Sequence, residues 1–368
     1  VFYRSALVNG KGASSILLSE RRALIDEISS DSKPIINAHA QGYYRVNYSP
    51  ELLTSLLKNG LQQLDVGERL SLLSDRWALT FFGYTPVDDY LKLTELISAE
   101  REPEVIAELV KELEYLNAFV EENQRKDFQR LVQSRLAAIA FDLGWKTSPQ
   151  DSDLRKIARS EVLAALGTIG QDAQTIEEAR KLFADYVKDE RSVDPDLLDA
   201  ITSIVAYNGD KDTYSQIERL WRASRTPEVR ERNLMALSRF RQPELIERTL
   251  KLTLSSEVKL QDSPNLLASV LATESGRSQA WKFIKANWKA LKNTYPMPSI
   301  PHVVARASLM STQDELDDLT QFLEDHPIEA GARKVAQTLE HVKNRVNFRR
   351  RSGPALSVEL SKVVSANR

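Results

Sequence analysis

The segment GYYRVNYSPELL (Gly42–Leu53) changes its character halfway along its length. Its first half is rich in aromatic residues and alternates in a way that is typical of a β-strand. Its second half is typical of a helix N-terminus, with Ser49 as the cap, Pro50 in the first turn and Glu51 favoured by the helix dipole. The sequence therefore predicts a boundary here between β-structure and a long helical region.

The chain before this boundary, residues 1–48, has the composition of an incomplete β-domain. VFYRSALV (Val1–Val8) predicts a strand, and IINAHAQGYYRVNY (Ile35–Tyr48) predicts two strands about a turn near Gln41 and Gly42. SILLSERRALIDEI (Ser15–Ile28) is compatible with further strand or with a helix. Three or four strands leave one face of a sandwich uncovered. We therefore interpret residues 1–48 as a partial β-sandwich segment.

The chain after the boundary, residues 49–368, repeats the same helix-start pattern. A capping or polar residue precedes a proline, polar or acidic residues follow in most cases, and an apolar pattern of helical period comes next. The segments are SPELL (Ser49–Leu53), TPVDDYL (Thr85–Leu91), EPEVIAEL (Glu102–Leu109), SPQDSDL (Ser148–Leu154), DPDLLDAI (Asp194–Ile201), TPEVRERNL (Thr226–Leu234), QPELIERTL (Gln242–Leu250) and SPNLLASVL (Ser263–Leu271).

The spacing of these prolines indicates paired helices. Pro103, Pro149 and Pro195 follow one another at intervals of 46 residues, which is about the length of a helix pair. Stacked pairs of this length build α-solenoids of the HEAT and armadillo kind, whose concave faces bind extended partners. We therefore predict a mainly α fold, an irregular HEAT/armadillo-like helical bowl over residues 49–368.

Composition excludes some classes of protein. The 368 residues carry 50 Lys and Arg against 52 Asp and Glu, and this net charge of −2 does not favour nucleic-acid binding. There is no cysteine, hence neither a disulfide framework nor a thiolate metal site. No apolar run reaches the length of a membrane helix and no signal region opens the sequence. We expect a soluble chain in the cytoplasm.

Motifs that carry chemistry are absent from the sequence. The histidines, His39, His302, His326 and His341, lie far apart, and neither HExxH nor a Gly-rich phosphate loop nor GxSxG occurs. Acidic pairs such as Glu121-Glu122, Glu177-Glu178 and Asp317-Asp318 are typical of solvated helix faces. We therefore predict no catalytic and no metal-binding residue.

Two further groups of residues have a structural and a functional interpretation. The run Asn347–Arg351 could bind an anion or an acidic partner, but we favour a cationic helix C-terminus with Ser352-Gly353-Pro354 as the stop. The aromatic residues at helical spacing are interpreted as core rather than as a binding surface. They are Trp77, Phe81, Phe82, Trp281, Phe283 and Trp288.

Five segments occur in an order that is itself informative. They are Asn37 with GYYRVNY (Gly42–Tyr48), ERLSLLSDRWALTFFG (Glu68–Gly83), RNLMALSRFRQPELIERTLKLTL (Arg232–Leu254), SGRSQAWKFIKANWKAL (Ser275–Leu291) and STQDELDDLTQFLEDH (Ser311–His326). In this order they resemble the end of the β-sandwich domain and the C-terminal helical domain of M1-family zinc aminopeptidases, the aminopeptidase N-like enzymes. One departure is that extra residues separate Asn37 from Gly42.

This resemblance implies a role without catalysis. In the family the zinc ligands, the general-base glutamate and the GxMEN motif lie in an upstream domain, and none of these motifs occurs here. The resemblance implies a C-terminal portion that caps the active-site chamber and gates access of peptides, with the catalytic domains and peptide substrates as partners. Zinc is expected in the catalytic domain and not in this chain. We expect the chain alone to be inactive.

The resemblance assigns no substrate-binding residue, because the matching motifs are interpreted as structural. We expect Arg45 to pair within the β–helix junction, and Asp75 and Arg277 to pack or cap helices. Arg306 lies where the family's chamber-lining helices run. The alternative to a part of an aminopeptidase is a free-standing α-solenoid adaptor that binds proteins, and the β-segment distinguishes the two because an adaptor does not need it.

Overall fold

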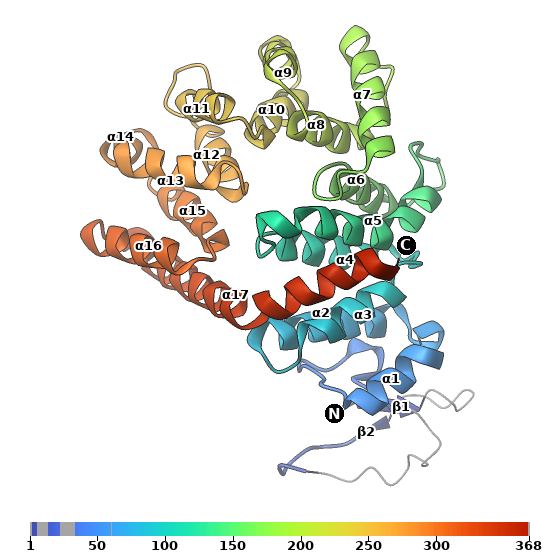
Figure 1. Cartoon of the computed structure of the whole chain (residues 1–368). Helices are drawn as coiled ribbons and strands as arrows, with labels where there is room; N and C mark the ends of the chain where they lie inside the picture. Colours follow the sequence, from blue (N-terminus) through green and yellow to red (C-terminus); the bar gives the residue numbers. More distant parts are fainter. Residues whose placement is uncertain (1, 6–13, 23–33, 60, 367–368) are drawn as a thin grey trace.

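A computed structural model describes residues 2–5, 14–22, 34–59 and 61–366 (Figure 1). Its β-structure is a small antiparallel sheet in which the strands lie in the order β2-β1-β3. Phe2 pairs with Ser15 on one side of β1, and Tyr3 pairs with Ile36 on the other. The strands are β1 (Phe2–Ser5), β2 (Ser14–Ser15) and β3 (Pro34–Ile36).

The sheet confirms part of the predicted β-segment and corrects another part. The described residues of VFYRSALV form β1, and residues 16–22 are irregular. The second strand predicted within Ile35–Tyr48 is wrong, because no strand forms over residues 42–48. Instead, the chain turns through a 3-10 helix η1 (Ala38–Ala40), in which His39 has a positive φ of 55°. The remaining residues of Val1–Val8 and of Ser15–Ile28 lie outside the described residues.

Helices make up nearly all of the remaining described chain, as predicted. The α-helices are α1 (Pro50–Asn59), α2 (Val66–Phe82), α3 (Val87–Leu96), α4 (Pro103–Asn117), α5 (Arg125–Leu143), α6 (Asp153–Gly167), α7 (Ala173–Lys188), α8 (Leu198–Tyr207), α9 (Lys211–Ala223), α10 (Pro227–Ala236), α11 (Pro243–Leu252), α12 (Ser263–Ala272), α13 (Arg277–Ala286), α14 (Trp288–Thr294), α15 (Ser299–Ala305), α16 (Gln313–Asp325) and α17 (Ala332–Ala366). Short 3-10 helices lie between them: η2 (Leu61–Gln63), η3 (Glu122–Gln124), η4 (Pro195–Leu197), η5 (Leu237–Arg239), η6 (Arg306–Leu309) and η7 (Glu329–Gly331).

The helices stack in an arc with an inner row (Figure 1). Along this row α4 contacts α6, α6 contacts α8, α8 contacts α10 and α10 contacts α12. The odd-numbered helices α7, α9 and α11 contact the inner helices from outside. This arrangement of stacked pairs confirms the predicted mainly α, solenoid-like bowl.

The last helix, α17, closes the arc (Figure 1). It packs against α15 and α16 at one end and against α2, α3 and α5 at the other. The predicted stop at Ser352-Gly353-Pro354 is therefore wrong, because α17 continues through Pro354 to Ala366. Proline removes one backbone hydrogen bond inside a helix, but Leu356 and Leu360 beyond it are fully packed in the core and hold the helix in place.

Three contiguous apolar cores run along the arc. The first joins α1–α6 to α17, the second extends from α6 to α12, and the third from α11 to α17. Trp77 and Phe81 contact Phe348 of α17 in the first core, as expected of core residues. Phe82 is an exception, because 56% of it is exposed. The third core contains the buried Trp281 and Trp288, with Phe283 packed against it, also as expected.

Candidate functional site

The β–helix junction is held by the Asp75 side chain of α2. The Asp75 carboxylate accepts from the backbone N–H of Val46 at 2.9 Å and from Arg45 Nη1 at 2.8 Å. Asp75 is buried, so these hydrogen bonds satisfy a charge that would otherwise be costly. The hydrogen bond from the Val46 N–H also explains why residues 42–48 form no strand, because this N–H donates to a helix side chain instead of to a neighbouring strand. The predicted pairing of Arg45 within the junction is confirmed.

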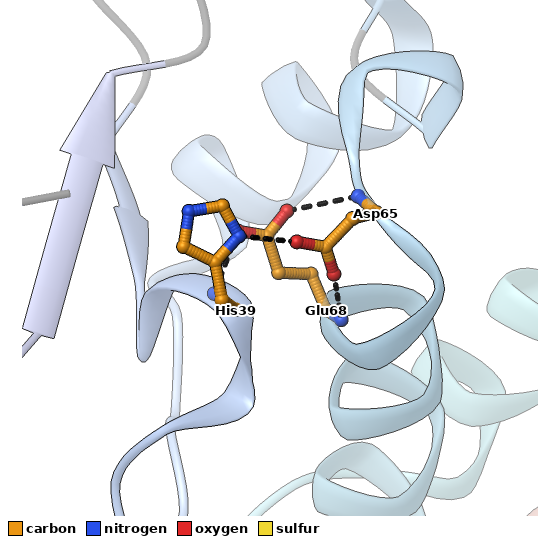
Figure 2. A group of neighbouring side chains, drawn as sticks. All are labelled: His39, Asp65 and Glu68. Carbon is orange, nitrogen blue, oxygen red and sulfur yellow. Dashed lines mark hydrogen bonds and ion pairs between the residues drawn. The ribbon is translucent and has the colours of Figure 1, made fainter. Parts of the chain in front are cut away.

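A second contact at the junction brings His39 against the start of α2 (Figure 2). His39 Nδ1 lies 2.5 Å from Asp65 Oδ2, and the ligand atoms of His39, Asp65 and Glu68 all lie within 4.8 Å of one another. Such a set could hold a metal ion in principle. However, the two Glu68 oxygens accept from the backbone N–H groups of His39 and Asp65. Asp65 in turn accepts from the Glu68 N–H and completes a capping box.

These contacts assign the His39 group a structural task. Each carboxylate satisfies backbone donors at a helix start, and the group ties the turn at Ala38–Ala40 to α2. We therefore derive no metal chemistry from it. Sequence reasoning placed His39 in a turn but missed this group, because residues 39 and 65 are joined only by the fold.

The other histidines do not meet. His326 is the C-cap residue of α16, its Nδ1 lies 3.2 Å from Phe322 O and its ring stacks on Phe322. His302 lies in α15 and His341 lies exposed on α17. In the described part of the chain the histidines are thus distributed over separate elements.

The basic run on α17 stabilises the C-terminal ends of other helices. Arg349 forms an ion pair with Glu121 and donates to Ala118 O at 2.9 Å, at the end of α4. Arg351 donates to Phe81 O at 2.6 Å, at the end of α2. Cations are favoured at helix C-termini. The sequence predicts that these cations stabilise the C-terminus of their own helix. They do lie at helix C-termini, but those of α2 and α4.

Charged side chains gather on the inner row of the arc. Glu114 of α4 and Glu161 of α6 are exposed, and Arg239 of η5 lies near Glu114. Surrounding protein raises the pKa of Glu114 by desolvation; Arg239 lowers it and Glu161 raises it. Desolvation also raises the pKa of Glu161. We call Glu114, Glu161 and Arg239 the inner-face cluster.

Arg239 also borders a hollow between α8 and α10. This hollow has an open volume of about 950 Å³. It contains the ion pair of Arg232 and Asp199, whose Nε and Oδ1 lie 2.6 Å apart. The lining residues are mainly polar and charged: Asp199, Thr202, Ser203, Glu228, Glu231, Arg232, Met235, Ala236 and Arg239.

A hydrogen-bonded bridge crosses from α4 and α5 to the turn before α13. Arg125 Nη2 lies 2.5 Å from Glu274 Oε1, and Asn117 Nδ2 donates to Glu274 Oε2 at 3.1 Å. Tyr207 of α8 faces this bridge: burial raises its pKa, and the charges of Glu274 and Arg125 act on it in opposite directions. The guanidinium carbon of Arg241 lies 4.4 Å from the centre of the Tyr207 ring.

The remaining residues singled out from the sequence have less specific places. Arg277 is the first residue of α13 and is buried, in agreement with a packing role. Arg306 is exposed in η6, and its position in a chamber wall stays a prediction. The absence of catalytic and metal-binding residues likewise stays a prediction. The inner-face cluster was missed, since its members stand 47 and 78 residues apart and share no motif.

No helix within the described residues has both the length and the apolar character needed to cross a membrane.

Comparison with known proteins identifies a family with similar sequence. Residues 35–344 match the family model of the ERAP1-like C-terminal domain. Aminopeptidase M1-A of rice is 26% identical over 84% of this chain, and Aminopeptidase M1 of Arabidopsis thaliana is 26% identical over 85%. Aminopeptidase 2, mitochondrial, of Saccharomyces cerevisiae is 22% identical over 91% of it.

The chain spans 36% of the length of each of these relatives. The family model covers the end of the β-segment, the junction and the whole inner row, and it stops within α17. The resemblance to the C-terminal region of M1 aminopeptidases is thereby confirmed. Because the match covers most of the chain, this protein belongs to the ERAP1-like C-terminal domain family.

Proposed function

We propose that this chain is the non-catalytic C-terminal portion of an M1-type zinc aminopeptidase, in which it forms the wall of a chamber and gates access of peptides. The observation that carries the proposal is the inner-face cluster. Its carboxylates are exposed to water while surrounding protein raises their pKa. Polar and charged groups on such a surface would orient a bound peptide by hydrogen bonds and ion pairs.

The closed arc supports this role. Because α17 packs on both ends of the stack, the inner row is held as one surface rather than as a flexible string of helices. Zinc, the activated water and the general base would come from the other domains of the enzyme, which are this chain's proposed partners. Peptides would meet the charged inner face before or while their N-terminal residue is removed.

A first experiment offers aminoacyl chromogenic substrates to the 368-residue chain with added zinc. We expect no turnover, because the proposal places all of the chemistry elsewhere. Chelator-sensitive turnover by the isolated chain would contradict the proposal.

A second experiment replaces the matching domain of Arabidopsis Aminopeptidase M1 with this chain. In the chimera, Arg239→Glu should raise KM for a peptide of about ten residues several-fold and leave KM for a one-residue aminoacyl substrate within about twofold, since only the longer substrate reaches the inner face. Arg219→Glu makes the same charge change on exposed α9 and should alter neither. Equal effects of Arg239→Glu on both substrates, or none on the peptide, would rule out the wall function.

The adaptor alternative makes a different prediction for the same chimera. A free-standing binding module would not assemble with the catalytic domains, so the chimera would be inactive on every substrate. No contact among the described residues favours the adaptor specifically.

A further inference from the structure

Two arginine side chains of α17 contact the end of α4, and a third lies close enough for their charges to act on it. Arg345 and Arg349 lie one turn apart on α17 and therefore share a face of that helix. Arg277 begins α13, whose N-terminus has no side-chain cap, and the positive charges of Arg345 and Arg349 act on it. Only 1% of Arg345 and 8% of Arg277 is exposed. We call these three residues the arginine seam.

The seam has more hydrogen-bond donors than acceptors. Arg345 Nε donates to Met310 O at 3.2 Å, but Arg345 Nη1 and Nη2 have no partner within the described residues. The same holds for Arg277 Nε and Arg349 Nε in this part of the chain. Proteins pair almost all of their buried polar groups, so four unpaired nitrogens in one place are unusual.

The orientation of Arg345 leaves its own unpaired Nη donors at the edge of the guanidinium group. Its guanidinium carbon lies 4.3 Å from the Tyr115 ring centre and 4.6 Å from that of Phe119. Stacking on aromatic rings uses the flat faces of a guanidinium group and leaves its N–H bonds in the plane of the group. The Nη donors without a partner thus lie at the edge of the stack.

Nearby carboxylates are already engaged. Glu315 Oε2 accepts from the N–H groups of Ser311 and Thr312 at the start of α16. Glu274 is bonded to Arg125 and Asn117, and Glu121 pairs with Arg349 through Nη1. Burial lowers the pKa of Arg345 and of Arg277. Tyr115 and Glu315 raise the pKa of Arg345 in part, and Glu315 and Glu274 do the same for Arg277, while the positive charge of Arg349 lowers both. None of these carboxylates is hydrogen-bonded to the unpaired guanidinium nitrogens of the seam within the described residues.

We propose that the arginine seam binds a small inorganic anion of the size of chloride. The anion would accept hydrogen bonds from Arg345 Nη1 and Nη2 and from Arg277 Nε, and it would offset the repulsion among the guanidinium groups. The near-complete burial of Arg345 favours a monatomic anion over a larger one. Binding would tie α17 to α13 and to the end of α4, and so strengthen the closure of the arc. This site is independent of the function proposed above.

Thermal unfolding of the 368-residue chain tests this proposal. Sodium chloride is compared with sodium gluconate and with sodium acetate, whose anions are larger, at equal ionic strength. We expect chloride to raise Tm by roughly 2–4 °C and the effect to saturate, as ligand binding to the folded state requires. Equal Tm values in both salts at every concentration would overturn the proposal, and an equal rise in acetate would overturn the assignment to a monatomic anion.

A variant and a matched control locate the effect. Arg345→Met replaces the buried cation with an apolar side chain of similar length and should abolish the response to chloride. Arg219→Met removes the same charge from exposed α9 and should keep the response. A chloride response that persists in Arg345→Met would contradict the proposal.

Bromide crystallography keeps the test open if Arg345→Met does not fold. Crystals of the unaltered chain soaked in sodium bromide should show an anomalous peak between Arg345 and Arg277. If the anomalous map shows bromide at other sites in the crystal but no peak at the seam, the proposal is overturned.

Discussion

The carboxyl group of Glu112 is completely buried in the described part of the chain. Tyr90 of α3 donates to Glu112 Oε2 at 2.6 Å, and neither residue has exposed surface. Burial raises the pKa of Glu112 well above its usual value. The folded protein thus keeps a proton on Glu112 that the unfolded chain releases above about pH 4–5.

The sign of the resulting pH dependence follows from this difference in bound protons. Because the folded state binds more protons, stability against unfolding falls as pH rises above the unfolded pKa, until the folded pKa is reached. Glu112→Gln keeps an acceptor for Tyr90 and has no proton to lose. We expect its stability relative to the unaltered chain to increase by up to about 1.4 kcal/mol for each pH unit in this range. Urea unfolding at pH 5, 6, 7 and 8 measures this.

Tyr90→Phe is the matched control. It removes the donor and leaves the Glu112 oxygen without its partner, so it should destabilise the protein by about 1–3 kcal/mol at every pH. A Glu112→Gln variant whose stability difference does not change between pH 5 and pH 8 would show that Glu112 is ionised when folded.

At the scale of elements, the helix-start pattern located the starts of several helices, and its failure at Pro149 has a physical cause. Helices begin at Pro50, Pro103, Pro227 and Pro243, as predicted from the residues around them. Ser148-Pro149 instead forms a turn, and α6 begins at Asp153. The reason is that Ser152 lies three residues before Arg155 and its Oγ accepts from the Arg155 N–H at 3.2 Å. Two capping sequences compete here, and local pattern alone does not rank them.

This competition yields a prediction for α6. Ser152→Ala should lower the free energy of unfolding by about 1 kcal/mol, since it removes the N-cap hydrogen bond. Pro149→Ala should change it by less than about 0.5 kcal/mol, because Pro149 occupies no helix position. Urea unfolding of both variants measures the difference. If Pro149→Ala were the more destabilising of the two, the assigned start of α6 would be wrong.

Two elements could not be predicted, because long-range contacts decide them. The segment of residues 42–48 has strand composition, but Asp75 of α2 takes the Val46 N–H that a strand neighbour would have used. Helix α17 runs through Ser352-Gly353-Pro354 because Leu356 and Leu360 are buried against helices more than 180 residues earlier in the chain. In both cases tertiary packing overrides a correct local preference.

At the scale of the molecule, the sequence predicted the bowl but not its inner face. Periodicity and proline spacing describe helix pairs, and stacked pairs dictate a concave surface. Which residues meet there depends on how each pair is rotated against the next. Glu114, Glu161 and Arg239 come from α4, α6 and η5, and no spacing along the chain links them. The arginine seam has the same origin, as it joins α13 to α17 across a closure that the local pattern does not reveal.

Two unequal contacts close the arc, and their magnitudes decide which one holds it. The Arg125–Glu274 pair is partly exposed, and such pairs contribute about 0.2–1 kcal/mol. Phe348 of α17 has no exposed surface and packs on Phe81, Phe119 and Trp77, and truncation of such a side chain costs about 3–5 kcal/mol. The apolar contact should therefore dominate.

Spin-label distances test which contact holds the arc, and the absence of cysteine makes specific labelling direct. Labels on Lys126→Cys of α5 and Lys282→Cys of α13, both exposed, span the two ends of the bridge. We expect a narrow distance distribution in the labelled parent and little change with Glu274→Gln. We expect a broad distribution with Phe348→Ala, because only this substitution frees α17 from α2 and α4. Val358→Ala, at an exposed site on the same helix, is the control and should leave the distribution narrow. Broadening by Glu274→Gln as large as that by Phe348→Ala would mean that the charged bridge, and not the apolar contact of α17, keeps the arc closed.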